Sequence, residues 1–185
     1  MSLDPPTYLS SLRNNIRARP IPWDGAVRAG TITEAQLGRI RAVDKVRKEV
    51  RVKTVEEGVG EYRELFLGAA GDGEGERSIL EKAARRADVV QYVLVLLGDL
   101  LEGSQTLVDA LLSHPNTYTP FLPLLAGATS PEEAIPLLTS TALTTLLARE
   151  SITNPHGRAA SSEALPILYK YLSTLALSSD SGLQD

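Results

Sequence analysis

Few residues of this chain have a type and spacing suited to catalysis. His114 and His156 are the candidates for an imidazole base or a metal ligand, and they lie 42 residues apart in proline-containing loops. They lack the i, i+4 spacing with which a metalloprotease helix holds zinc. The chain has no cysteine, which excludes thiolate metal sites, disulfides and a cysteine nucleophile. No Gly-x-Ser-x-Gly elbow, Walker loop or paired-acid motif occurs. We therefore predict a protein that is not an enzyme, with no catalytic, cofactor-binding or metal-binding residues.

Two charged segments are natural candidates for binding phosphate or nucleic acid. In residues 71–76 glycines alternate with acids, which would repel the phosphate that a glycine-rich loop binds, so we interpret this segment as a connector. Residues 45–53 hold five cations but no interleaved aromatic residue, so no nucleic-acid partner is predicted. We interpret them as a solvated charged face. Their alternation could also suit a short strand, so that the preceding helix would end inside them.

The charges are divided unevenly along the chain. Residues 1–53 carry 11 Lys/Arg and 5 Asp/Glu, whereas residues 54–185 carry 8 and 18, within a formal net charge of −4. A basic N-terminal arm on an acidic body suggests contact with an acidic partner. The alternative is that the basic helix lies on an acidic neighbour within the same chain.

A central helix is predicted over residues 88–101, where apolar residues recur at helical spacing and leave little polar surface. Such a helix must be buried on most sides. It is shorter than the roughly 20 residues that cross a bilayer, and Gln91 and Asp99 interrupt it. No direct membrane insertion is predicted.

The N-terminal 30 residues are predicted to form a helical arm. Residues 7–18 have one apolar face, and the prolines that follow end the helix. Trp23 opens a short helical turn that ends at Gly30 and is the only tryptophan of the chain. Trp23 could anchor the arm to the body or act as a binding hot spot for a partner.

Capping signals mark three further helix starts: Thr33–Gln36, Thr54–Glu57, and Ser130–Glu133 with its proline at the first helical position. Other helices are expected over residues 78–87, 104–113, 118–125 and 161–177. Residues 133–138 and 163–168 are similar strings 30 residues apart, and residue 90 aligns with residue 135. Such spacings favour armadillo or HEAT-like stacking, with a compact helical bundle as the alternative.

Two strings resemble a known family. Asn-Ile-Arg-Ala-Arg-Pro-Ile-Pro-Trp at 15–23, continued by Ala-Gly-Thr-Ile-Thr at 29–33, resembles the N-terminal signature of the H subunit of the vacuolar proton-pumping ATPase (V-ATPase), especially its fungal members. Val-Val-Gln-Tyr-Val-Leu at 89–94, with Asp-Leu-Leu at 99–101, is similar to a Val-Gln-Tyr helix of that family. The resemblance extends over essentially the whole chain.

The resemblance implies an all-α fold, an armadillo/HEAT-like right-handed α-solenoid preceded by an N-terminal amphipathic helix. It implies a non-catalytic regulatory subunit of the soluble V1 sector, cytoplasmic and peripheral on the cytosolic face of the vacuolar membrane. Such a protein would bind the peripheral stalk subunits E and G and other V1 subunits, and support ATP hydrolysis coupled to proton transport. The partner-binding candidates are Arg13, Arg17, Trp23 and Arg28, although each cation could instead be a solvated surface charge.

The chain differs from the family in length, because family members are more than twice as long. We expect an arm over residues 1–30, a truncated solenoid domain over residues 31–185, and the absence of the family's C-terminal domain. Ile167, Leu168, Leu172 and Leu175 would then face a missing neighbour. Two other functions stay open: an armadillo-like adaptor that recognises trafficking peptides, and a membrane-surface protein held weakly by the helix at 7–19.

Overall fold

The computed structural model describes residues 7–69, 77–127, 130, 132–154 and 159–177, and no strand occurs among them. The predicted all-α class is therefore confirmed. The helices are α1 (Thr7–Ala18), α2 (Trp23–Arg28), α3 (Glu34–Val43), α4 (Lys48–Glu57), α5 (Val59–Leu67), α6 (Ile79–Lys82), α7 (Ala87–Gly103), α8 (Gln105–Leu112), α9 (Leu122–Ala126), α10 (Ala134–Thr153) and α11 (Ala159–Ala176).

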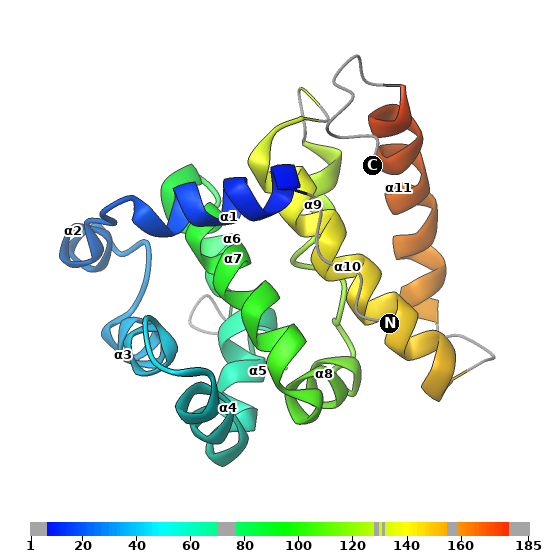
Figure 1. Ribbon diagram of the computed structural model, residues 1–185. Coiled ribbons are helices and arrows are strands. Elements are labelled where there is room, and N and C mark those ends of the chain that lie inside the picture. The colour runs from blue at the N-terminus through cyan, green and yellow to red at the C-terminus, as the bar shows by residue number, and fades with distance from the viewer. Residues whose placement is uncertain (1–6, 70–76, 128–129, 131, 155–158, 178–185) are drawn as a thin grey trace.

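In Figure 1, α2, α3 and α4 lie on one side of the molecule and α11 on the other, with α7 and α10 between them. Neighbours in sequence pack on one another, as in the pairs α3–α4, α4–α5, α7–α8 and α10–α11. Contacts between neighbours along a row of short helices define an α-solenoid, as predicted. The right-handed sense of the solenoid stays a prediction.

The predicted central helix is α7, and its neighbours explain its composition. α7 is contacted by α1, α4, α6, α8 and α10. Ten of its residues are buried, because helices cover nearly its whole circumference. Burial of each large apolar side chain stabilises the fold by roughly 1.5–3 kcal/mol, so α7 is the centre of the core.

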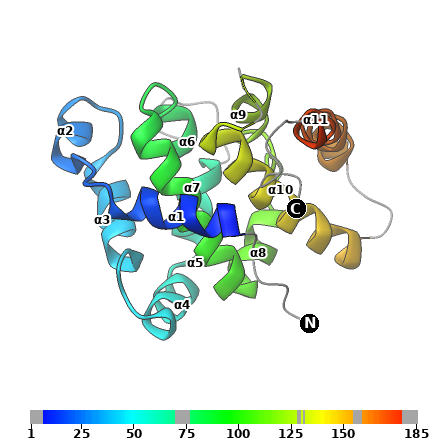
Figure 2. The ribbon, with the colours of Figure 1, turned by 45° about the horizontal axis from the view of Figure 1, so that its top comes forward.

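Helices that are not consecutive also pack on one another, as in the pairs α7–α10, α5–α8 and α9–α11, and α1 makes the contact that is most distant in sequence. It lies across α7 in both views, and its Arg17 contacts Asp99, 82 residues away in sequence (Figures 1 and 2). Ile16 enters the core with 1% of its surface exposed. The amphipathic helix predicted at residues 7–18 is thus present and packed on the body. The domain division at residue 30 stays a prediction.

Several helix boundaries follow the capping signals. Thr33 and Gln36 form the predicted capping box at the start of α3. Gly30 and Gly68, with φ of 68° and 82°, adopt the left-handed conformation that ends α2 and α5. An unpredicted capping box of Ser78 and Glu81 opens α6, which is shorter than the helix expected at 78–87.

One alternative and two local predictions were wrong. Residues 48–53 are helical in α4 and form no strand. Thr54 lies inside α4, where its hydroxyl donates to the Val50 carbonyl at 2.9 Å, so Thr54–Glu57 is no helix start. α10 begins at Ala134 with Glu133 as its N-cap, later than the Ser130 start expected. The connector at 71–76 lies outside the described residues.

α11 buries one face against α9 and α10 and exposes another. Leu168 and Leu175 are buried, and Ile167 packs against the core. The expectation that these three residues face a missing neighbour was therefore wrong. Leu172 is 38% exposed, and Leu165 and Tyr169 share its outer face at i, i+4 and i+7 spacing.

Candidate interaction surface

Arg13 fastens the middle of α1 to α7. Its side chain is only 9% exposed, and Nη1 donates to Oε1 of Glu102 at 2.8 Å. A Cβ atom at Gly98 of α7 would lie 3.2 Å from Arg13 Nη2, so the glycine leaves room for the guanidinium on the helix surface. Arg13 therefore contacts α7 within the chain.

Arg17 lies one turn further along α1 and shares Asp99 of α7 with an arginine of α4. Arg17 Nη2 donates to one oxygen of the Asp99 carboxylate, and Arg51 Nη1 of α4 donates to the other at 3.3 Å. The Asp99 side chain is 14% exposed. One carboxylate on α7 thus joins three helices, and Arg13, Arg17 and Arg51 lie on acidic residues of their own chain.

Trp23 reaches the same region through Tyr92. The two rings meet edge to face, with centroids 5.5 Å apart and planes at 84°. The Tyr92 hydroxyl donates to the Asp44 carboxylate, whose oxygens lie 2.7 and 2.8 Å away. Burial, then the hydrogen bond to Asp44, raises the pKa of Tyr92, so its hydroxyl stays protonated and remains a donor.

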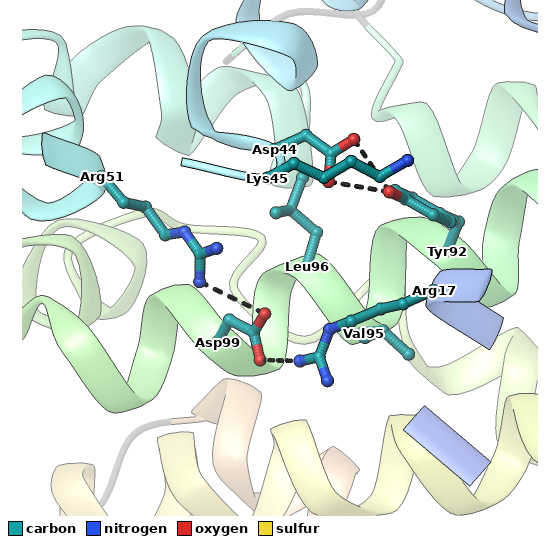
Figure 3. A pocket seen from close by; sticks show the side chains of 8 residues that line it. All are labelled: Arg17, Asp44, Lys45, Arg51, Tyr92, Val95, Leu96 and Asp99. Carbon is teal, nitrogen blue, oxygen red and sulfur yellow. Dashed lines mark hydrogen bonds and ion pairs between the residues drawn. The ribbon is translucent and has the colours of Figure 1, made fainter. Parts of the chain in front are cut away.

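A cavity of about 80 Å³ opens where these side chains converge (Figure 3). Lys45 lies on its rim at the turn between α3 and α4, with a φ of 54°. In Figure 3 its side chain extends toward Tyr92. The cavity is lined by Arg17, Asp44, Lys45, Arg51, Tyr92, Val95, Leu96 and Asp99. Three cations and two carboxylates leave one positive charge uncompensated.

The structure brings two of the four predicted contact residues near this cavity. Arg17 lines the cavity, and the ring of Trp23 contacts Tyr92, which also lines it. Arg13 is buried, and Arg28 is exposed with its Nε donating to the Asp24 carbonyl at 3.3 Å. Contact of all four with a partner stays a prediction.

Sequence reasoning missed the carboxylates and the lysine of this site. Asp99 carried a signal, because it is a charge within an otherwise apolar helix. Asp44 carried none, and Lys45 was noted only as one of the five cations at 45–53, since a loop sequence does not reveal a positive φ or a partner 48 residues away.

Other sites of interest are few within the part of the chain that the structure describes. No group of three or more His, Asp or Glu side chains there could hold a metal ion. None of its helices is long and apolar enough to cross a membrane. His114 is buried, and its Nδ1 accepts a hydrogen bond from the Asn116 amide at 3.1 Å.

A row of packed helices with ion pairs at its surface is a helical-repeat scaffold, a class whose members act by binding other proteins. The chain belongs to the family of the V-ATPase H subunit, whose family model matches residues 7–185. That family is a regulatory, non-catalytic component of the V-ATPase. No solved structure matches the chain.

Proposed function

We propose that this chain binds the peripheral stalk of the V-ATPase, made of subunits E and G, and supports ATP hydrolysis coupled to proton transport. It would do so within the V1 sector, on the cytosolic face of the vacuolar membrane. The observation that carries the proposal is the match to the H-subunit family over residues 7–185.

The surface of the N-terminal third supports a role in docking. A stack of helices gives a rigid, extended surface along which a partner helix can lie. Arg28 is exposed and makes no ion pair with another described residue. We therefore propose Arg28 as a stalk contact, together with Trp23 at the start of the same short helix. Arg13 and Arg17 would contribute by holding α1 on α7.

Calorimetry with a purified E–G heterodimer tests the proposal. The unmodified chain is expected to bind, and Arg28→Glu to bind more weakly because the charge reversal opposes an acidic contact. Lys170→Glu, the same reversal on an exposed residue of α11, is the matched control and is expected to bind normally. Absence of binding by the unmodified chain would contradict the stalk role. Equal weakening by both variants would contradict the assignment of Arg28.

A further inference from the structure

We propose that the cavity between α1, the α3–α4 turn and α7 binds the carboxylate side chain of an acidic segment in a partner protein, with Lys45 as the cation that recognises it. The proposal goes beyond stalk binding, because it concerns the chemistry of one pocket whichever partner supplies the carboxylate.

The turn that carries Lys45 is held from two sides. Arg51 Nε donates to the Val43 carbonyl at 3.0 Å, and Arg51 Nη2 to the Val46 carbonyl at 3.5 Å. On the other side, Tyr92 holds the Asp44 carboxylate. The backbone on both sides of Lys45 is therefore fixed before any ligand arrives, and a preorganised site loses less entropy on binding.

Lys45 is the unusual residue of the turn. A positive φ is uncommon for a residue with a Cβ atom, and such outliers cluster at functional sites. Lys45 is exposed, and it makes no hydrogen bond or ion pair with any other residue the structure describes. By contrast, both arginines of the cavity share Asp99. The ammonium group of Lys45 is thus available to an incoming anion, and the surplus positive charge of the cavity favours one.

The size and floor of the cavity favour a side-chain carboxylate. Its volume of about 80 Å³ is far below the 300–1,000 Å³ of pockets that hold drug-sized ligands, which excludes a nucleotide. Val95 and Leu96 close the inner end of the cavity and are 2% and 3% exposed, so they offer an incoming group only a small apolar surface. A glutamate can place its carboxylate beside Lys45 with its last methylene group against this surface, whereas phosphate has no apolar part to bury.

Trp23 supplies a direct readout, because it is the only tryptophan and its ring contacts Tyr92 at the edge of the cavity. We would titrate the full chain with a short synthetic Glu-Ala peptide and record Trp23 fluorescence. A saturable change is expected that weakens as salt is added, since the contact is electrostatic. The Gln-Ala counterpart of the peptide is expected to give no change.

Variants assign the effect to Lys45. Lys45→Asn removes the charge but tolerates the positive φ, and is expected to weaken binding by up to about fivefold, the upper end of the range for one exposed ion pair. Lys45→Arg keeps the charge and is expected to bind as the unmodified chain does. Lys48→Asn removes an exposed charge from α4 that does not line the cavity, and is the matched control.

Each outcome supports or overturns the proposal. No change with the Glu-Ala peptide, or equal weakening by Lys45→Asn and Lys48→Asn, would overturn it. A stronger response to inorganic phosphate or to anionic phosphatidylserine vesicles would overturn the carboxylate assignment. The two proposals are tested by different ligands. A negative result with the peptide would overturn the carboxylate pocket without contradicting stalk binding, and a negative result with the E–G heterodimer would overturn stalk binding without contradicting the pocket.

Discussion

His114 shows how burial changes the acid–base behaviour of a single residue. Burial, reinforced by the nearby charge of Arg63, lowers the pKa of its imidazole from the ordinary value of 6.5. Its buried Nε2 has no hydrogen-bond partner among the described residues, so a proton there would bring a charge without a compensating group. The folded protein therefore holds His114 neutral.

A pH dependence of stability follows. The unfolded chain binds the His114 proton more readily than the folded chain, so stability is full above the unfolded pKa and is lost as pH falls below it. As the pH falls from about 7.5 to about 5.5, the free energy of unfolding is therefore expected to fall because of this residue. Urea unfolding at the two pH values measures the change. His114→Asn, which retains an acceptor for the Asn116 amide, should remove it, and an unchanged slope in that variant would assign the effect elsewhere.

Lys45 is expected to lower the stability of the fold through its backbone conformation. A residue with a Cβ atom in the left-handed region carries a cost of roughly 1–2 kcal/mol, and asparagine pays less of it. Lys45→Asn is therefore expected to raise the free energy of unfolding by up to about 1 kcal/mol, measured by chemical denaturation. A loss of stability would show that the lysine makes a stabilising contact within the chain.

Between elements, the contact of α1 with α7 depends on Arg13 more than on its ion pair. The carboxylate partner Glu102 is 62% exposed, so the pair itself should contribute at most about 1 kcal/mol. The aliphatic stem of Arg13 is buried against α7, and its Nε lacks a hydrogen bond within the described part of the chain.

Three substitutions separate packing from charge at this contact. Arg13→Ala is expected to cost about 2 kcal/mol, because it leaves a gap between the helices. Glu102→Gln should cost less than about 1 kcal/mol, and Arg13→Met, which fills the space without a buried charge, should cost no more than Glu102→Gln. Thermal unfolding ranks the variants. If Glu102→Gln proves as costly as Arg13→Ala, the ion pair holds α1 in place.

How far the elements could be predicted depended on where their determinants lie. α3 was predicted because Thr33 and Gln36 satisfy each other three residues apart. The same local pattern at Thr54–Glu57 gave a wrong helix start, because α4 begins at Lys48 and already includes these residues. No local sequence signal marks that earlier start. The Asp99 site was out of reach: Arg17 is 82 residues from Asp99, and Arg51 is 48 residues from it. The uneven division of charge indicated an acidic contact for the N-terminal third, but only the fold shows that Arg13, Arg17 and Arg51 make such contacts within the chain.

For the whole molecule, a row of helices implies that stability varies along its length. In a solenoid each unit is stabilised by its neighbours, so an end unit has fewer contacts than a central one. α7 is covered by five helices, whereas α11 contacts α9 and α10. Backbone amides of α7 are therefore expected to exchange with solvent most slowly, and those of α11 faster, in native-state hydrogen exchange.

Substitutions on the two faces of α11 test this picture. Leu168 is 6% exposed, so Leu168→Ala should cost about 2–5 kcal/mol of local stability and speed exchange in α11, with little effect on α3 at the far end of the row. Leu172→Ala, on the outer face of the same helix, removes a 38% exposed side chain. It should change the free energy of opening of α11, measured by hydrogen exchange, by less than about 0.5 kcal/mol. Exchange that accelerates equally in α3 and α11 after Leu168→Ala would mean that the helices unfold as one cooperative bundle. Acceleration confined to α11 and its neighbours would establish that each helix is stabilised mainly by the helices packed directly on it.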